Sequence, residues 1–191
     1  MQQTAATQRQ RTKAKLYARY PLSSLLMYNG STILHYLLGG IGIIAAYNFS
    51  WIAYFFGFLY LAYSIVEMYL MMPLTVCPNC VYFRMENSLC ISGLNVLSKK
   101  IAKEGNPKDF PKRAEGLFCY NNLYIAALAI PIIVMIPGLI INFSFLLLAI
   151  LLVLVGLLLF RFFVIFPQIA CLHCYAKYNC PQAEAMGVRS L

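Results

Sequence analysis

Four long apolar stretches constrain the fold of this chain more than any other feature. They lie at 25–47, 51–72, 123–141 and 143–166. A helix needs roughly 20 apolar residues to cross about 30 Å of hydrocarbon, and each stretch approaches or exceeds that length without a run of charges. The composition agrees, because 61% of the residues are hydrophobic and only 11% are charged. The sequence therefore predicts an all-α integral membrane protein with four transmembrane helices.

The connections between these stretches predict how the helices pair. An Asn-Phe-Ser tripeptide at 48–50 joins the first two stretches, and the same tripeptide at 142–144 joins the last two. Helices joined by such short links can only lie antiparallel to one another. We therefore expect two helical hairpins, separated by a long polar segment at about 73–122.

The two predicted hairpins have the same link, proline and cysteine residues at matching positions. Their Asn-Phe-Ser links are 94 positions apart, and the same shift aligns Pro73 with Pro167, Cys77 with Cys171 and Cys80 with Cys174. This register predicts a duplicated hairpin. Parallel repeats are related by a pseudo-two-fold axis along the membrane normal, so we expect the two Cys-x-x-Cys pairs to emerge at one depth and on one side of the membrane.

The duplication divides the chain into five segments. A basic segment at 1–22 comes first, followed by a hairpin with the CPNC motif at 23–90, a loop at 91–120, a hairpin with the CLHC motif at 121–180 and a tail at 181–191. Within the loop, Leu94, Leu97 and Ile101 follow a near-helical spacing. That spacing predicts a short amphipathic helix on the membrane surface, with its lysines towards lipid headgroups or a partner.

The distribution of positive charge predicts the orientation. Every lysine and arginine except Arg161 lies before the first apolar stretch, in the long polar segment at about 73–122 or after the last stretch. Cytoplasmic segments retain an excess of these residues, so we expect a multi-pass protein of the cell (inner) membrane with cytoplasmic termini and cytoplasmic, cysteine-rich helix ends. This topology explains the net charge of +9, so membrane lipid is an expected partner and nucleic acid is not.

The seven cysteines all lie in predicted cytoplasmic or interfacial segments: Cys77, Cys80, Cys90, Cys119, Cys171, Cys174 and Cys180. Cytosolic thiols stay reduced, and an odd number cannot pair completely. A Cys-x-x-Cys spacing lets both sulfurs approach one ion at about 2.3 Å. We predict that the two Cys-x-x-Cys pairs share one tetrathiolate metal centre. The other three cysteines, with His173, are candidate ligands of a second centre.

Three chemical roles for these thiols stay open. An iron–sulfur cluster, our preferred hypothesis, would transfer electrons to a membrane carrier or a partner subunit. A zinc ion with four cysteine ligands would be a structural staple, leaving function elsewhere. A quinone-linked thiol–disulfide oxidoreductase is the third hypothesis. The active cysteines of such oxidoreductases face an oxidising compartment, whereas the charge distribution here places the thiols in the cytoplasm.

Three ionisable residues lie within the predicted spans: His35, Glu67 and Arg161. Such residues are costly in a bilayer and usually mark a function or a pairing. The 94-residue shift aligns Glu67 with Arg161, which predicts an ion pair across the pseudo-axis. The alternative is a polar wall that binds the headgroup of a quinone, so all three are candidate cofactor-binding residues.

Overall fold

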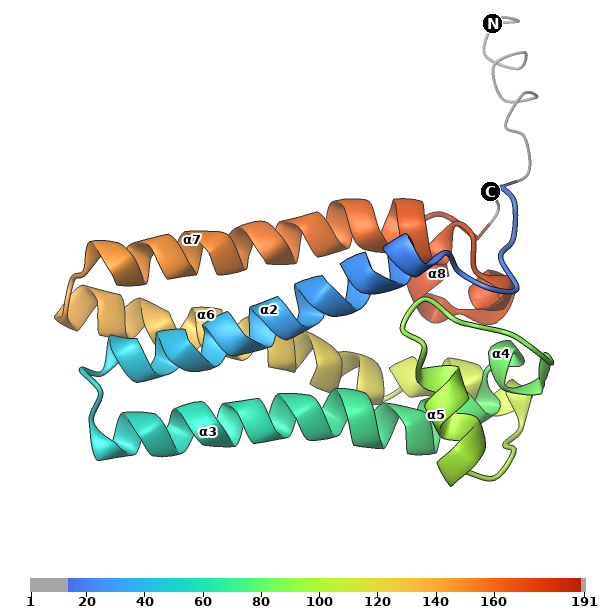
Figure 1. Cartoon of the computed structure of the whole chain (residues 1–191), viewed down its shortest axis with the longest axis horizontal. Helices are drawn as coiled ribbons and strands as arrows, with labels where there is room; N and C mark the ends of the chain where they lie inside the picture. Colours follow the sequence, from blue (N-terminus) through green and yellow to red (C-terminus); the bar gives the residue numbers. More distant parts are fainter. Residues whose placement is uncertain (1–13, 190–191) are drawn as a thin grey trace, which may run out of the picture.

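The structure, a computed structural model, describes residues 14–189; the rest of the predicted N-terminal segment and the last two residues of the tail lie outside it. The described chain is all-helical, without a strand. Four long helices lie side by side as a bundle (Figure 1): α2 (Leu22–Ala46), α3 (Trp51–Val66), α6 (Tyr120–Ile141) and α7 (Phe145–Phe160). These four helices, with the continuations of α3 and α7, are long and apolar enough to cross a membrane. The predicted all-α fold, with four helices long and apolar enough to span a membrane, is confirmed.

Helix α2 holds the bundle together. It packs against α3, α6 and α7, and α6 packs against α7. Helices α2 and α6 approach closely at Gly138, where an added β-carbon would lie 2.8 Å from the backbone oxygen of Ala46. Without a hydrophobic driving force between helices in lipid, such small-residue contacts allow close van der Waals packing.

The second helix of each hairpin changes its winding part-way along. Helix α3 continues as a π-helix, η1 (Glu67–Val76), and α7 continues as a π-helix, η4 (Arg161–Cys171). Both changes occur 94 positions apart, and so do the starts of α3 and α7. Long π-helical segments are rare and often lie at functional sites.

The two aligned prolines, Pro73 and Pro167, lie inside the π-helices. The helices continue beyond Pro73 and Pro167 because the wider π turn leaves room for a ring that would collide with an α-helical backbone. Side chains also satisfy backbone carbonyls here: Thr75 Oγ1 donates to Met71 O (2.6 Å) and Asn79 Nδ2 donates to Thr75 O (2.9 Å). Each second span therefore reaches its first cysteine without a break.

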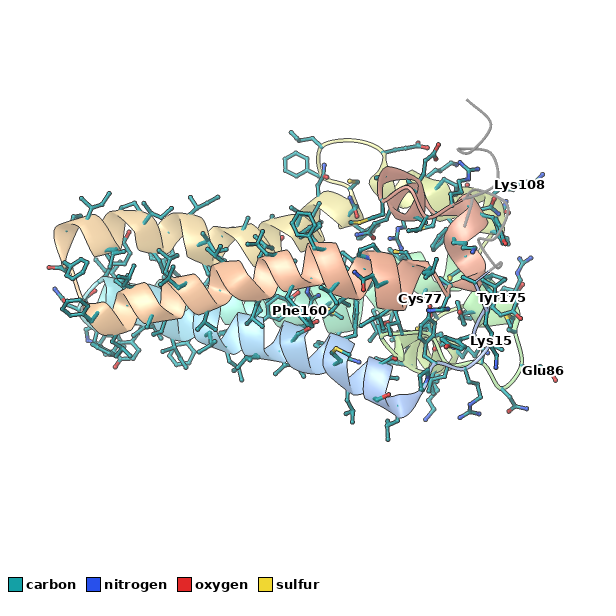
Figure 2. All side chains as sticks on the ribbon, turned by 90° about the horizontal axis from the view of Figure 1, so that it is seen from above. Lys15, Cys77, Glu86, Lys108, Phe160 and Tyr175 are labelled. Atoms are coloured by element: carbon teal, nitrogen blue, oxygen red, sulfur yellow. The ribbon has the colours of Figure 1, made fainter. Side chains whose placement is uncertain are left out.

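Short elements gather at one end of the bundle (Figure 1): η2 (Cys77–Asn79), α4 (Val81–Arg84), α5 (Leu94–Ile101), η3 (Pro107–Ala114), η5 (Tyr175–Asn179) and α8 (Pro181–Ala185). Figure 2 shows Cys77, Lys15 and Lys108 at this same end, with Phe160 in the body of the bundle. We call it the cysteine end.

The predicted short helix in the loop is confirmed as α5. Leu94 is buried, whereas Leu97 and Ile101 are exposed. The rest of the buried face is polar: Ser98 Oγ donates to Pro73 O (2.6 Å), and Asn95 Nδ2 donates to Ser88 O (3.1 Å). The first of these hydrogen bonds fixes α5 against η1 and the second fixes it to the preceding loop, contacts that hydrophobic periodicity alone cannot predict.

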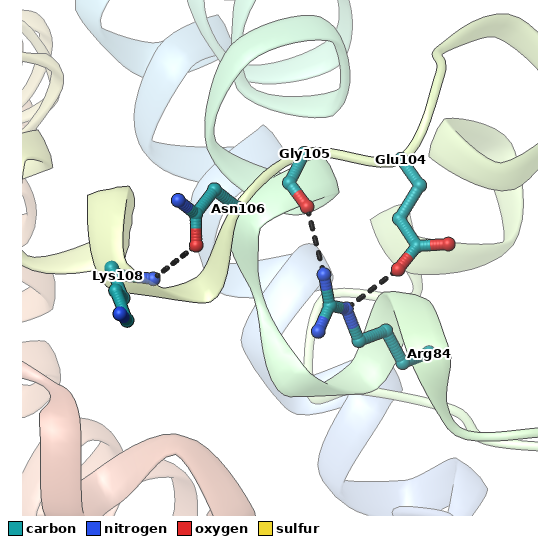
Figure 3. Close-up of polar contacts among 5 residues, drawn as sticks. All are labelled: Arg84, Glu104, Gly105, Asn106 and Lys108. Atoms are coloured by element: carbon teal, nitrogen blue, oxygen red, sulfur yellow. Dashed lines mark hydrogen bonds and ion pairs between the residues drawn. The ribbon is translucent and has the colours of Figure 1, made fainter.

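Polar contacts also hold the following loop against the CPNC turn (Figure 3). Arg84 Nε pairs with Glu104 Oε1 at 2.7 Å, and Arg84 Nη2 donates to Gly105 O at 3.0 Å. The side chain of Asn106 accepts a hydrogen bond from the Lys108 amide (3.1 Å) and begins η3. The Gly105 amide donates to Pro78 O (3.2 Å), so the loop covers one side of the first Cys-x-x-Cys motif.

The contact between α2 and α6 can be tested with Gly138→Ala. The added methyl group would meet the Ala46 backbone, which can give way only if the helices separate. We expect a loss of about 1–3 kcal/mol in the free energy of unfolding, measured as a lower melting temperature in detergent micelles.

Gly156→Ala is the matched control, because an added β-carbon there meets nothing within 4 Å. This substitution raises helix propensity, so stability should stay equal or rise. Equal destabilisation by both substitutions would contradict the close approach of α2 and α6.

Candidate metal centre

Six of the seven cysteines line one cavity of about 160 Å³ at the cysteine end of the bundle: Cys77, Cys80, Cys90, Cys171, Cys174 and Cys180. Three belong to the first predicted hairpin and three to the second. Protein interiors are close-packed, and a cavity of roughly 150 Å³ is large enough to admit a benzene-sized molecule. The fold thus brings both Cys-x-x-Cys motifs, and two further thiols, to one enclosed space.

The two Cys-x-x-Cys motifs reach the cavity through matching turns. The Cys80 amide donates to Cys77 O (3.0 Å), and the Cys174 amide donates to Cys171 O (3.3 Å). After each turn the chain becomes extended, with φ −85° and ψ 147° at Cys80 and φ −84° and ψ 131° at Cys174. A helix end followed by a tight turn therefore presents two sulfurs from each hairpin.

The remaining two cysteines of the cavity lie on separate loops. The Cys90 amide donates to Asn95 Oδ1 at 3.0 Å, and its sulfur lies 3.4 Å from Ser92 Oγ. Cys180 precedes α8 and is buried. These contacts come from residues close in sequence, so each loop orients its own thiol.

The cavity lining is positively charged. It includes Arg113 and Lys177, and no aspartate or glutamate is among the described lining residues. Lys177 is 1% exposed, and its Nζ donates to Leu172 O at 3.3 Å. Arg113 Nη2 donates to Gln182 Oε1 at 2.9 Å, and its guanidinium lies 5.0 Å from the centre of the Phe110 ring. Cations beside thiols, one of them buried, favour negative charge in the cavity, such as that of metal-bound thiolates.

The protonation of the thiols follows from their burial. Burial raises the pKa of Cys80 to about 11, a hydrogen bond from the Tyr82 backbone opposes this shift, and the neighbouring thiol of Cys90 adds to it. Burial also raises the pKa of Cys174, and Cys80 contributes to the shift. Without a bound cation these thiols are protonated at neutral pH, and a thiol is a much weaker nucleophile than a thiolate.

The thiols surround a space and do not converge on a point. Within residues 14–189, no three histidine, cysteine, aspartate or glutamate side chains lie close enough together to hold a single metal ion. Four thiolates on one zinc ion at 2.3 Å would be separated by roughly 3.8 Å. A single ion would therefore require the cavity to contract.

The other two predicted ligands lie away from the cavity. Cys119 Sγ accepts a hydrogen bond from the Asn122 amide (3.4 Å) at the start of α6. His173 Nδ1 lies 2.8 Å from Lys15 O, and its ring packs on Tyr17 with 4.6 Å between ring centres. Neither residue lines the cavity, so the structure does not bring together the predicted second ligand set.

The three ionisable residues of the spans are buried below the cavity and do not line it. His35 Nε2 lies 2.9 Å from Leu128 O. Arg161 donates to the hydroxyls of Tyr124, Ser31 and Thr32 and to the Tyr28 carbonyl.

The predicted ion pair between Glu67 and Arg161 is wrong. Neither carboxyl oxygen of Glu67 has a hydrogen-bond partner, because hydroxyls and a carbonyl from α2 and α6 surround the guanidinium. Equivalent positions in two hairpins need not touch, since contacts with the other helices decide where each side chain points.

Sequence reasoning missed the aromatic layer between Arg161 and the cavity. The guanidinium carbon lies 5.2 Å, 5.7 Å and 5.9 Å from the ring centres of Tyr28, Tyr124 and Phe166. All three rings line the cavity. Such contacts help to hold a buried cation. The only signal in the sequence was an arginine in a span, since no local pattern distinguishes these rings from the other aromatic residues.

The segment before α2 ties the two hairpins together above the cavity. The Tyr17 amide donates to His173 O (2.9 Å), and the Tyr82 hydroxyl donates to Tyr17 O (2.6 Å). The Tyr20 amide donates to Leu89 O (2.9 Å), and its hydroxyl donates to Ala170 O. One short segment thus connects residues that follow the first Cys-x-x-Cys motif to a residue within the second motif, His173, and to one just before it, Ala170.

Comparison with models of protein families, with curated proteins and with solved structures gives no match for this chain. Function is therefore inferred from the geometry and chemistry of the cavity.

The tie across the cavity can be tested with Tyr82→Phe. This substitution removes the hydroxyl that donates to Tyr17 O and leaves a carbonyl without its partner. We expect the free energy of unfolding to fall by about 1–2 kcal/mol, measured by thermal denaturation in micelles. Tyr178→Phe is the control, since its ring is 52% exposed, and it should change stability by less than about 0.5 kcal/mol. Similar losses for both variants would show that the hydroxyl of Tyr82 contributes nothing to the tie.

Proposed function

We propose that the protein holds an iron–sulfur cluster in its cysteine-lined cavity and transfers electrons between a membrane carrier and a redox partner. One observation carries this proposal: six thiols line a single cavity of about 160 Å³ together with two cationic side chains. Iron–sulfur clusters are bound by cysteine thiolates, and their potentials respond to charge and burial. The donor set and the size of the cavity fit such a group.

The size of the cavity favours a cluster over zinc. A cluster core contains several iron and sulfide atoms, so its thiolate ligands surround a volume. A structural zinc ion needs four sulfurs at one point, an arrangement that the described residues do not form. The Cys-x-x-Cys pairs Cys77/Cys80 and Cys171/Cys174 are the proposed primary ligands, and Cys90 and Cys180 are further thiols beside the same group.

Thiol–disulfide exchange is less well supported. Fast exchange requires a thiolate near neutral pH, whereas the pKa of Cys80 is raised to about 11 and that of Cys174 is also raised. Metal binding removes this obstacle, because a bound cation stabilises the thiolate directly.

We infer that the two hairpins are copies and that the cysteine end faces the cytoplasm of the cell (inner) membrane. Matching changes from α- to π-helix and matching cysteine turns, each 94 positions apart, support the duplication. The basic residues of the loop lie beside the cavity, and positive charge marks the cytoplasmic side. A quinone is the proposed membrane carrier, because the buried polar groups His35, Glu67 and Arg161 lie in the bundle below the cavity.

Metal analysis of anaerobically purified protein tests this function. We expect iron and acid-labile sulfide together with broad visible absorption. Replacing Cys77 and Cys171 by serine should abolish both. Cys119→Ser is the matched control, because a serine hydroxyl keeps the cap of α6 and Cys119 lies outside the cavity lining; its iron content should stay the same.

Two results would contradict the cluster. One zinc ion per chain without colour would establish the structural staple instead. Absence of metal, with Cys77 and Cys80 joined by a disulfide in the freshly isolated protein, would favour thiol–disulfide exchange.

Proton release provides a second test. The buried thiols are protonated in the metal-free protein because burial raises their pKa values, Cys80 to about 11. Ligands must lose their protons to bind metal, so reconstitution should release protons into weakly buffered solution, which a pH-indicator dye can measure. The apparent metal affinity should fall by up to about tenfold per pH unit on acidification for each proton released. An affinity independent of pH would exclude thiolate ligation.

A further inference from the structure

The carboxyl group of Glu67 is buried in the membrane-spanning bundle without a partner. Its side chain is 2% exposed, and neither Oε1 nor Oε2 accepts or donates a hydrogen bond. Glu67 lies where α3 becomes η1, within the span Trp51–Asn79. An ionisable group in a bilayer marks a functional site by default, and a buried polar group without a partner requires an explanation.

Arg161, the cation buried in the same bundle, does not neutralise this carboxyl group. Arg161 is 1% exposed and directs its nitrogens to Tyr124, Tyr28, Ser31 and Thr32. A carboxylate in a permanent ion pair would stay ionised over the physiological pH range. Because Arg161 is engaged elsewhere, Glu67 is free to gain and lose a proton.

Glu67 is connected to the cavity by continuous packing. The next residue, Met68, lines the cavity, and the hydroxyl of Tyr36 lies 3.9 Å from its sulfur. Tyr36 also lies near the carboxyl group of Glu67 and near Arg161. Ten residues of continuous helix separate Glu67 from Cys77, at most about 15 Å at 1.5 Å per residue. At that distance, one charge added in the cavity changes the proton affinity of Glu67 several-fold.

The groups that surround Glu67 leave it as the proton acceptor. Tyr60 and Tyr63 donate their hydroxyl protons to Ala127 O and Leu123 O, both at 2.9 Å. On the elements packed against η1, and on α2, η1 and η4, the titratable and charged groups are Tyr28, His35 and Tyr36 of α2, Tyr54, Tyr60 and Tyr63 of α3, Tyr69 of η1, Tyr120 and Tyr124 of α6, Lys99 and Lys100 of α5, Cys77 of η2 and Arg161 and Cys171 of η4. Lys99 Nζ donates to Met85 O (2.7 Å) at the cysteine end. Within this set there is no second carboxyl group.

We propose that Glu67 is an intramembrane proton-binding site that takes up one proton when the centre in the cavity gains one electron. This inference rests on the proposed function. The electron comes from a one-electron donor, such as a reduced viologen in vitro, which is thereby oxidised. The proton comes from water and forms an O–H bond on one carboxyl oxygen of Glu67. No other bond changes, and the net charge of the protein interior stays the same.

Redox-difference infrared spectroscopy of the full chain in micelles tests the site directly. Reduction by dithionite-reduced viologen should produce the carbonyl band of a protonated carboxylic acid in the wild type and not in Glu67→Gln. The midpoint potential should fall by up to 59 mV per pH unit in the wild type, the value for a tenfold change in proton concentration with one electron. In Glu67→Gln it should be nearly independent of pH. Glu86→Gln, at an exposed loop position, is the matched control and should behave as the wild type.

Two further arms keep the outcomes distinct. If Glu67→Gln does not fold, Glu67→Asp replaces it, and this variant must shift the frequency of the carboxylic-acid carbonyl band. An unchanged band and potential slope in either variant would overturn the proposal. Infrared titration of metal-free protein tests the proton site independently of the centre. If no centre forms but a Glu67 band titrates, the proposed function fails and the coupling with it, while the proton site stands.

Discussion

Unbroken backbone hydrogen bonding through two prolines is the constraint on which this structure depends. In hydrocarbon, every backbone polar group must find a partner within the protein, so a span cannot simply stop at Pro73 or Pro167. The wider turns of η1 and η4 accommodate both rings, and the helices end only at the cysteines. The depth of the thiols follows directly from where these π-helices end.

The cavity places cationic side chains beside thiols, and within residues 14–189 no acidic side chain of its lining neutralises them. Six thiols, a buried lysine and an arginine share a space with no acidic residue in the described lining. Protonated thiols do not neutralise these cations, whereas metal-bound thiolates would. Beyond the aromatic layer, Arg161 and Glu67 are also buried without forming an ion pair with each other. Charge that enters the cavity therefore has groups within the membrane that can respond to it.

The tie formed by residues before α2 shows how the two halves depend on each other. Tyr17 and Tyr20 form hydrogen bonds with Tyr82 and Leu89 after the first Cys-x-x-Cys motif, and with Ala170 and His173 just before and within the second. Each hairpin supplies half of the thiols, and neither encloses the cavity alone. In lipid, helices associate without a hydrophobic driving force. Hydrogen bonds at the cysteine end therefore help to fix the position of one hairpin relative to the other.

Hydrophobic length, short links and the spacing of cysteines were enough to predict the four spans and to expect both Cys-x-x-Cys pairs at one shared place. These features are local or repeat along the chain, so they can be recognised without a structure. The partners of Arg161 and Glu67, the polar buried face of α5 and the separation of Cys119 and His173 from the cavity could not be predicted in this way. Each depends on contacts between residues far apart in sequence, because packing against neighbouring helices decides where a side chain points. The chain thus specifies its helices and its thiols by composition and spacing, whereas the space that the thiols enclose arises only when the two hairpins meet.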